Sequence, residues 1–554
     1  MCKKALFWFA LAATLVVTTA SSAFSAWLAK DFDIEGQVFP EDMLFQAAVS
    51  LTLFHDEDQA KSDPVLFSLW LGADISSLTD EDGRELEFEG PYTEGERGFD
   101  VFHMKVYLKE PLSPQEEERL TFRYRAIFDG VVSNHISPIN SYQLQESYWY
   151  PKVGEVFAGG ELNLGPVQMS ITVPSDQTVV SEGELLEVID GEETKTYVWW
   201  SDRHPFGFMS AVYKKVREMV EGIEFTAWVF PRYEGAVSAL QEVIVDAMKF
   251  FSEAFLPYPD ARFSVAQVKW RGGYGSMPLL LNEEYFKGVL VQRDIDLLSH
   301  EAAHRWWGGG LVQTATLKDR WLSEGFAQYS SLLYVGHSLG RERMLEKLRE
   351  NVQGYLGLDP SEDVPMNSGQ WGGSAVDILY HKGSYVLHML RFVLGDDLFF
   401  DTMRAFAQEH YNGLASIDDF QDVAERVGGE DLDWFFDEWI RGTGVPSYRV
   451  QDFYMVGDNG AWSAKVRAFQ DSTFDMPVEV TFLTEGGDMT GRMRVDSTVS
   501  EHIFPLGSRP LSFSFDQDDW ILKRDLVYQF PIKSLQAEPS DGGILLSWEK
   551  SEGG

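Results

Sequence analysis

The chain has 554 residues, of which 44% are hydrophobic, 24% are charged and 14% are aromatic. This composition excludes a disordered or fibrous protein for most of the length and leads us to expect about three to four folded domains. The 46 Lys and Arg against 87 Asp and Glu give a formal net charge of −41, which argues against nucleic acid and anionic lipid as partners. The single cysteine, Cys2, excludes an internal disulfide and any multi-cysteine metal site.

The N-terminus has the layout of a signal peptide. Two lysines precede the apolar stretch Ala5–Val17, and small residues follow it. We expect residues 1–25 to be the signal peptide, with cleavage after Ala23 or Ser25. The alternative is an uncleaved membrane anchor, for which the apolar stretch is short. No later segment has the length and apolarity of a membrane span, so we expect an exported protein, secreted or periplasmic, without stable membrane insertion after signal cleavage.

Strand-like and helical patterns divide the rest of the chain. Residues 27–212 show short alternating apolar runs separated by Gly, Pro, Asp and Ser, which predicts an N-terminal β domain. Helical spacing begins at Val237–Phe255, and a mainly helical domain is expected over 213–446. The further helical segments are Ile295–Trp307, Leu322–Leu339, Arg341–Leu356, Ile378–Leu394, Leu398–His410 and Ile417–Val427. Strands return in 447–533, which predicts a small C-terminal β-sandwich, and 534–554 is a polar tail. The predicted fold class is α+β multidomain.

The residues that carry chemistry are His300-Glu301-Ala302-Ala303-His304. Positions i and i+4 of a helix share one face, so both imidazoles can reach one ion. Glu301 lies beside that face, where it can take a proton from a water molecule that the metal activates. A catalytic zinc needs a third protein ligand and an open position. Glu324 follows His304 with nineteen residues between, which is enough for a turn and an antiparallel return helix. The alternative is an ordinary helix that carries two histidines.

The string HEAAHRWWGG…WLSEGFAQY closely resembles the aminopeptidase N-like family of gluzincin metallopeptidases, whose relatives include leukotriene hydrolase. Tyr380-His381-Lys382-Gly383 resembles the family's Tyr-x-Lys-Gly motif, and 434–444 resembles the end of its catalytic domain. The stretches 474–480 and 513–522 look like the family's small β domain. The resemblance covers 27 to about 530 and implies a thermolysin-like catalytic domain over 213–446.

The resemblance implies a role for each site residue. His300, His304 and Glu324 would bind one Zn²⁺ per chain, Glu301 would be the general base, and Tyr380 would donate a hydrogen bond to the oxyanion. The physical chemistry agrees, because a zinc-activated water is a competent nucleophile near neutral pH and the developing negative charge needs a positioned donor. Tyr385, five residues further along the same helix, is the weaker candidate for that donor.

Two departures from the family concern the shape of the site. The family has eighteen residues between the second His and the Glu, and the extra residue here falls in Gly308-Gly309-Gly310. Glycine tolerates unusual backbone angles, so we expect Glu324 to keep its ligand geometry. The larger aminopeptidases also carry a long helical C-terminal domain that closes over the cleft. After Pro531 only 23 residues remain here, so we expect a more open site.

A third departure concerns the substrate's amino terminus. The family's Gly-x-Met-Glu-Asn motif corresponds to residues 275–279, where Pro278 replaces the glutamate that binds the free α-amine. Proline supplies neither a charge nor an amide donor. Gly275, Ser276 and Met277 remain candidate substrate-binding residues in this stretch.

Three glutamates are candidate replacements for the missing anchor. Glu146 falls where the family has another substrate contact and is a further candidate substrate-binding residue. Glu283 and Glu284 follow Pro278 closely in sequence. The alternative for each is an ordinary surface carboxylate.

These observations predict an exported zinc-dependent metallopeptidase that hydrolyses peptide bonds and is aminopeptidase-like. Its partners would be peptide substrates, with no nucleic acid. Pro278 raises one alternative, a zinc endopeptidase or a peptidase that needs no free N-terminus. A second alternative is a non-catalytic peptide-binding scaffold on the same fold. Such a scaffold would be expected to lose Glu301, a ligand or Tyr380, and none of them is lost.

Overall fold

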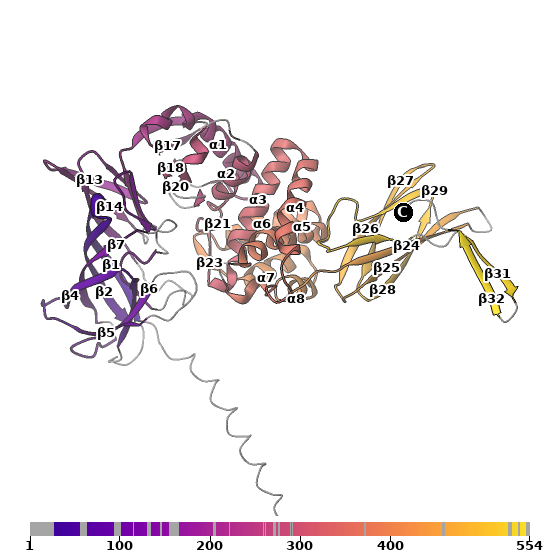
Figure 1. Ribbon diagram of the computed structural model, residues 1–554, viewed down its shortest axis with the longest axis horizontal. Helices are drawn as coiled ribbons and strands as arrows, with labels where there is room; N and C mark the ends of the chain where they lie inside the picture. Colours follow the sequence, from indigo (N-terminus) through magenta and orange to yellow (C-terminus); the bar gives the residue numbers. More distant parts are fainter. Residues whose placement is uncertain are drawn as a thin grey trace, which may run out of the picture.

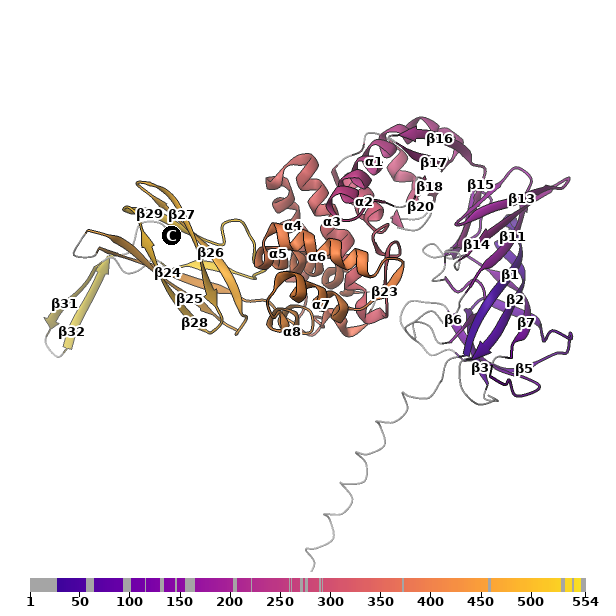
Figure 2. The same ribbon diagram turned by 180° about the vertical axis from the view of Figure 1, so that it is seen from behind.

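The structure is a computed structural model with three bodies in a row, namely a β domain, a helical domain and a second β domain (Figure 1). The described residues are 27–55, 64–92, 101–114, 116–129, 134–144, 147–154, 165–202, 207–220, 222–258, 260, 262–269, 273–274, 278–287, 290, 292–370, 373–456, 460–529, 534–540 and 543–549. In two opposite views the helices lie between the two β domains (Figures 1 and 2). The predicted α+β multidomain architecture is confirmed.

The N-terminal β domain contains three sheets. A seven-stranded sheet has the order β13-β14-β11-β1-β2-β7-β4, and two four-stranded sheets have the orders β10-β3-β6-β5 and β12-β15-β9-β8. Alternate residues of β1 and β2 face a core of aromatic and branched side chains, as the period of two requires. The strands are β1 (Trp27–Phe39), β2 (Leu44–His55), β3 (Val65–Trp70), β4 (Ala73–Thr79), β5 (Glu87–Tyr92), β6 (Val101–Tyr107), β7 (Glu118–Ile127), β8 (Asn134–His135), β9 (Asn140–Leu144), β10 (Lys152–Val153), β11 (Val167–Pro174), β12 (Thr178–Ser181), β13 (Glu184–Asp190), β14 (Thr194–Ser201) and β15 (Gly207–Ala211).

The middle domain begins with a mixed sheet in the order β16-β17-β18-β20-β19. Its strands are β16 (Lys214–Val220), β17 (Ile223–Val229), β18 (Arg262–Val268), β19 (Gly273–Tyr274) and β20 (Leu279–Asn282). The short strand β19 lies at the edge and pairs antiparallel with β20. Within the described residues, the first side chain after the gap that follows β19 is Pro278, which is buried.

Helices make up the rest of the middle domain. They are α1 (Val237–Ala254), α2 (Gln292–Ala303), α3 (Trp321–Leu339), α4 (Arg341–Leu356), α5 (Gly383–Leu394), α6 (Asp396–Glu409), α7 (Ile417–Gly428) and α8 (Asp433–Trp439), with a π-helical segment, η7 (Asp377–Lys382), directly before α5. Short 3-10 turns occur at η1 (Pro40–Asp42), η3 (Pro231–Ala236), η4 (Glu283–Phe286), η5 (Leu317–Asp319) and η6 (Met366–Ser368). The small sheet β21 (Trp307–Gly308), β22 (Val312–Thr314) and β23 (Gly413–Ala415) links α2, α3 and α6.

One predicted helix is too long at its end. The sequence pattern predicted a helix through Trp307, but α2 stops at Ala303. The amides of Arg305 and Trp306 bond to carbonyls three residues back, because the last turn tightens before the chain enters β21. His304 therefore lies in a tight turn that continues the helix.

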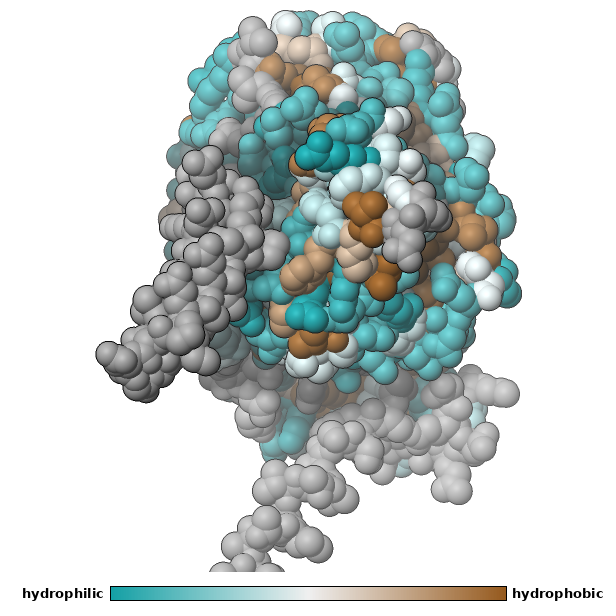
Figure 3. Space-filling model, turned by 90° about the vertical axis from the view of Figure 1, so that its right-hand side faces the viewer, coloured by the Kyte–Doolittle hydropathy of each residue, from teal (hydrophilic) through white to brown (hydrophobic). Residues whose placement is uncertain are grey.

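The C-terminal β domain is a sandwich of two sheets, β28-β25-β24-β30 and β27-β26-β29. Its strands are β24 (Tyr448–Val456), β25 (Trp462–Gln470), β26 (Met476–Thr484), β27 (Gly487–Val495), β28 (Val499–Leu506), β29 (Pro510–Phe515) and β30 (Leu526–Tyr528). A hairpin of β31 (Ser534–Ser540) and β32 (Gly543–Glu549) projects beyond it (Figure 1). Hydrophilic residues cover most of this end of the molecule (Figure 3). Among the described residues, no helix has the length and apolarity of a bilayer span.

Candidate metal centre and active site

Two helices bring the three predicted ligands together. His300 lies in α2, His304 lies in the turn after it, and Glu324 lies in the first turn of α3. The Oε2 atom of Glu324 is 3.6 Å from Nε2 of His300 and 3.4 Å from Nε2 of His304. Ligands of a tetrahedral zinc ion, with bonds of about 2.0–2.1 Å, lie about 3.3–3.4 Å apart. The spacing of the three donor atoms therefore fits one zinc ion.

The surroundings of two of the three ligands, His304 and Glu324, also fit a metal. The Nδ1 atom of His304 is 3.0 Å from the carbonyl of Trp307, so it can donate its proton there and keep the lone pair of Nε2 for an ion. The Oε2 atom of Glu324 is buried and has no hydrogen-bond partner among the described residues. A buried carboxylate oxygen needs compensation, and a divalent cation would supply it.

The charges at the centre favour a cation beside Glu324. Burial alone would lower the pKa of His304, but the Glu324 carboxylate raises that pKa to about 9. Burial alone would raise the pKa of Glu324, but the two imidazoles hold it below its usual range. The Glu324 carboxylate is therefore held in its charged form in a buried site, where a bound cation would compensate that charge.

Glu301 and Tyr380 flank the three ligands. Glu301 is buried, and burial raises its pKa while both imidazoles oppose the shift. The Tyr380 ring stacks on the His300 ring, with 5.6 Å between centroids and 10° between planes. Burial, followed by the Glu324 carboxylate, raises the pKa of Tyr380 well above its ordinary value. Tyr380 therefore remains a phenol that can donate a hydrogen bond.

The weaker candidate for the oxyanion donor has another partner. The hydroxyl of Tyr385 donates to the carbonyl of Asp519 in the C-terminal β domain, at 2.7 Å. Tyr385 is buried in α5 at the contact between two domains. Of the two tyrosines, the structure places Tyr380 at the metal ligands.

The segment that carries Tyr380 shows features that the sequence analysis did not single out. Tyr380 lies in the π-helical segment η7, and such segments are rare and frequent at functional sites. Lys382 in the same segment is fully buried, and its ammonium lies 5.1 Å from the centre of the Tyr355 ring. Burial lowers the pKa of Lys382 to about 8. The Tyr-x-Lys-Gly motif was the only sequence signal for this lysine.

The glycine run after His304 is closely packed at two of its three positions. Gly308 has a φ of 84°, and a Cβ atom there would lie 1.9 Å from the Ser323 hydroxyl oxygen. A Cβ atom on Gly310 would lie 1.9 Å from the Arg305 carbonyl oxygen, whereas Gly309 has open space. The loop therefore passes close to the start of α3 at Gly308 and close to the turn after α2 at Gly310.

Most of the predicted substrate-binding residues lie outside the described residues: Gly275, Ser276, Met277 and Glu146. Among the glutamates near Pro278, Glu283 is already paired. Its carboxylate lies 2.7 Å from Arg232 and 2.9 Å from Lys287. The hydrogen bond from Lys287 is the main cause that lowers the pKa of Glu283. A carboxylate held by two cations is a poor anchor for a substrate ammonium, which leaves Glu284 and Glu146 as the candidates.

Two helices and the turn after the first thus present His, His and Glu, with a glutamate and a tyrosine beside them. This arrangement is a candidate metal centre of the gluzincin type. Residues 274–439 match the Peptidase family M1 domain. The fold is that of the crystal structure of Legionella pneumophila aminopeptidase A in complex with aspartic acid, with a TM-score of 0.71 at 16% identity over 92% of this chain and 60% of that one.

Curated relatives agree with this assignment. The alanine/arginine aminopeptidase of Saccharomyces cerevisiae is 26% identical over 37% of this chain and 26% of its own length. Aminopeptidase N of Lactococcus lactis is 24% identical over 50% of this chain and 36% of its own length. The chain thus matches only about a third or less of these relatives. The resemblance to the aminopeptidase N-like gluzincins is confirmed by the match of residues 274–439 to the M1 domain and by these relatives.

Proposed function

We propose that the protein is a zinc-dependent metallopeptidase that hydrolyses peptide bonds and is aminopeptidase-like. The convergence of His300, His304 and Glu324, whose ligand atoms all lie within 4.8 Å of one another, carries this proposal. Zinc bound there would polarise the scissile carbonyl and activate a water molecule. The M1 domain and the aminopeptidases among its relatives support peptide substrates over other substrate classes.

The chain's own residues would then perform the proton transfers and hold the charge. Glu301 would accept a proton from the attacking water and pass it to the leaving amine, a role that its buried position and raised pKa suit. Tyr380 would donate its phenolic proton in a hydrogen bond to the carbonyl oxygen as negative charge develops there. The retention of Glu301, Tyr380 and all three ligands disfavours a non-catalytic scaffold.

A second candidate function is a peptidase that needs no free N-terminus, including an endopeptidase. It is favoured by Pro278 at the position of the family's amine-binding glutamate and by the two ion pairs that engage Glu283. The same zinc chemistry would operate in both cases, so the two candidates differ only in how the substrate's amino end is held.

We further propose that the mature protein is exported, secreted or periplasmic, with peptides as its partners and neither nucleic acid nor a stable membrane insertion. The two lysines and the apolar stretch Ala5–Val17 support this proposal, and residues 1–25 lie outside the described residues. N-terminal sequencing of the protein recovered from its producing cells would test it. A chain that retains residues 1–25 in the cytoplasm would contradict export.

Elemental analysis and a peptide library test the catalytic proposal together. Protein purified without added metal should contain about one zinc per chain, and chelation should remove both the zinc and the hydrolysis of peptides. Glu324→Ala should retain the fold and lose the zinc. Peptide cleavage that survives complete removal of zinc would overturn the proposal. Mass spectrometry of the products would distinguish an aminopeptidase-like enzyme from a peptidase that needs no free N-terminus.

A further inference from the structure

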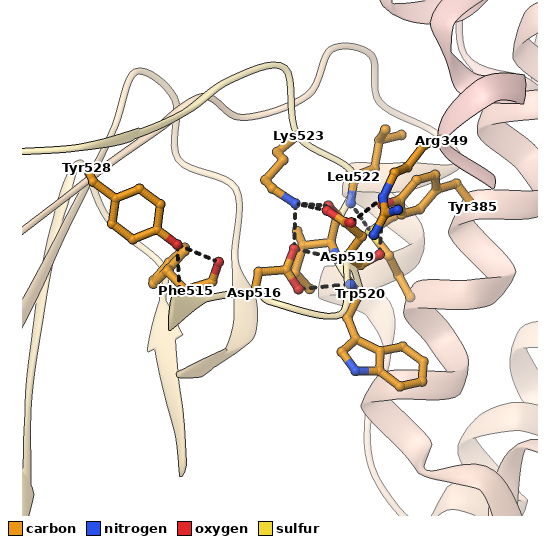
Figure 4. A network of polar contacts seen from close by, with 11 residues as sticks. Arg349, Tyr385, Phe515, Asp516, Asp519, Trp520, Leu522, Lys523 and Tyr528 are labelled. Carbon is orange, nitrogen blue, oxygen red and sulfur yellow. Dashed lines mark hydrogen bonds and ion pairs between the residues drawn. The ribbon is translucent and has the colours of Figure 1, made fainter. Parts of the chain in front are cut away.

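Helix α5 contacts a loop of the C-terminal β domain, and this loop, residues 516–523, is called here the Asp519 loop. It follows β29 and reaches the helical domain as a compact turn (Figure 4). The hydroxyl of Tyr385 donates to the carbonyl of Asp519, and the guanidinium of Arg349 in α4 lies 2.5 Å from the Asp519 carboxylate. One loop residue thus holds two helices of the catalytic domain.

Aromatic stacking reinforces this contact. The ring of Trp520 lies parallel to the ring of His388, with 4.5 Å between centroids and 14° between planes. The same indole stacks on Phe392 one turn further along α5, at 5.2 Å. The amide of Leu522 donates to the sulfur of Met389 at 3.4 Å. The Asp519 loop therefore packs along about two turns of α5.

The Asp519 loop is stiffened from within. The buried carboxylate of Asp516 accepts hydrogen bonds from the amides of Trp520 and Ile521, at 2.8 and 3.1 Å. The ammonium of Lys523 lies 2.7 Å from Asp516 and 2.9 Å from Asp519 (Figure 4). A satisfied buried network of this kind specifies one conformation. The loop therefore presents a fixed surface to α5.

The other side of α5 is tied to α3, the helix that carries Glu324. The indole of Trp321 donates to the carbonyl of Gly383 at 3.0 Å. The hydroxyl of Tyr329 lies 3.1 Å from Nδ1 of His388. These two contacts involve residues of α3 on either side of Glu324 in the sequence. Helix α5 is therefore held by α3 on one side and by the Asp519 loop on the other.

We propose that Tyr385, Asp519 and Trp520 are positioning residues that fix Tyr380 against the metal site, an inference that rests on the proposed function. Tyr380 lies in η7, which runs directly into α5, and a π-helical segment departs from the regular α-helical bonding pattern. The position of Tyr380 therefore depends on where α5 is held. A displacement of about 1 Å in a catalytic group can cost on the order of a hundredfold in rate. The C-terminal β domain thereby acts on catalysis without touching the substrate.

A double-mutant cycle tests this role. Tyr385→Phe removes one hydroxyl and keeps the ring, and we expect it to lower kcat about tenfold while KM and zinc content stay unchanged. In a Tyr380→Phe background the same substitution should change kcat less than about twofold, because the group it positions is already gone. Trp520→Ala should behave as Tyr385→Phe does, and Trp520→Phe should recover most of the activity because a stacking ring remains.

A matched control separates positioning from general loosening of the domain. Arg524 joins the same two domains through the carbonyl of Leu356 at 2.7 Å, at the end of α4. Arg524→Gln should leave kcat within about twofold of the wild type. Thermal unfolding of every variant would show that all are folded.

The outcomes distinguish this inference from the proposed function. Two results would overturn the proposed function and with it the positioning role. In the first, the wild-type protein hydrolyses no peptide. In the second, Glu301→Gln hydrolyses peptides as fast as the wild type does. A wild-type protein that hydrolyses peptides, but in which the Tyr380 and Tyr385 substitutions multiply in their effects on kcat, overturns the positioning role alone. An unchanged kcat in both Tyr385→Phe and Trp520→Ala would also overturn the positioning role and leave the proposed function intact.

Discussion

Glu301 is buried, and burial disfavours the charged form of its carboxylate. This environment suits the role of general base that we propose for it. Burial raises its pKa, while the imidazoles of His300 and His304 oppose the shift. A base in this position binds a proton more readily than an exposed glutamate does. The same burial keeps bulk water away from the charge that develops beside it.

The substitution Glu301→Gln tests that role at the smallest scale. Because glutamine has nearly the same shape and cannot accept the proton, we expect zinc content to stay near one per chain and kcat to fall at least about a hundredfold. Elemental analysis and steady-state kinetics on a peptide measure the two quantities. Glu342→Gln, on the exposed start of α4, is the control. A variant that keeps wild-type kcat would remove Glu301 from the mechanism.

At the scale of elements, the loop between α2 and α3 connects the two histidines to Glu324, the third ligand that we propose. Gly308 and Gly310 cannot carry side chains without contact to Ser323 or to the Arg305 carbonyl, whereas Gly309 faces open space. We expect Gly308→Ala and Gly310→Ala to lower the free energy of unfolding by more than about 1 kcal/mol and to weaken zinc binding. Gly309→Ala should lie within about 0.5 kcal/mol of the wild type.

Chemical denaturation and a zinc competition titration measure these effects. Gly309→Ala is the matched control, since it changes the same loop by the same group. Equal losses in all three variants would mean that the loop requires flexibility throughout, and the two close approaches would then not explain the glycine run.

His388 in α5 makes the contact between α5 and the Asp519 loop sensitive to acid. Burial, followed by the charges of Arg391 and Arg341, lowers the pKa of His388 to about 3, although Asp519 and Asp396 oppose the shift. The unfolded chain binds this proton below its ordinary pKa of 6.5, and the folded chain does so only near 3. The unfolded state therefore holds more protons between these values, and stability falls as pH decreases through this window.

Replacement of His388 by glutamine should remove that sensitivity. One proton contributes a slope that approaches about 1.4 kcal/mol per pH unit below pH 6, so the wild type should lose stability faster than His388→Gln between pH 6 and pH 4. Free energies of unfolding from urea titrations at several pH values measure the difference. The carboxylates elsewhere contribute equally to both proteins. Parallel curves would show that His388 does not titrate in this way.

The sequence predicted the elements well where period and motif agreed. The helical spacing in Val237–Phe255 and Arg341–Leu356 predicted α1 and α4 to within a residue, because an amphipathic face repeats every 3.6 residues. The closeness of His300 and His304 was also predictable, because positions i and i+4 share one helix face. The approach of Glu324 rested on the resemblance to the family. The end of α2 was predicted wrongly. The tryptophans after His304 continue the apolar spacing of the helix, but the helix ends at Ala303 and Trp307 belongs to strand β21.

Other features of the site depend on contacts between distant segments. The π-helical segment at Tyr380 has no distinct sequence period, and the partner of Tyr385 lies 134 residues away. The pairing of Glu283 with Arg232 depends on a contact across 51 residues. The sequence alone does not show which distant segments meet. It favoured Tyr380 over Tyr385 through the Tyr-x-Lys-Gly motif, but the partner of Tyr385 needed the structure.

At the scale of the whole molecule, the charge of −41 gives the protein a diffuse negative field. Such a field attracts cationic peptides, but salt screens it beyond about 8–10 Å and it does not fix the position of a particular ammonium group. A dedicated carboxylate does fix that position, and it offsets the cost of removing the ammonium from water. Pro278 occupies the place where the resemblance expects that carboxylate, and the Glu283 carboxylate is held by Arg232 and Lys287.

We therefore expect this protein to depend only weakly on a free amino terminus. N-acetylation of a good peptide substrate should lower kcat/KM only about tenfold, on the order of 1.4 kcal/mol. Raising the salt concentration should reduce the difference between the free and the acetylated peptide, because screening weakens a diffuse field more than a direct ion pair. A loss of about a thousandfold that persists at high salt would instead reveal a dedicated anion. Glu146→Gln and Glu284→Gln would then identify it, with Glu283→Gln as the paired control, because a carboxylate already engaged by two cations should contribute little to the binding of a third.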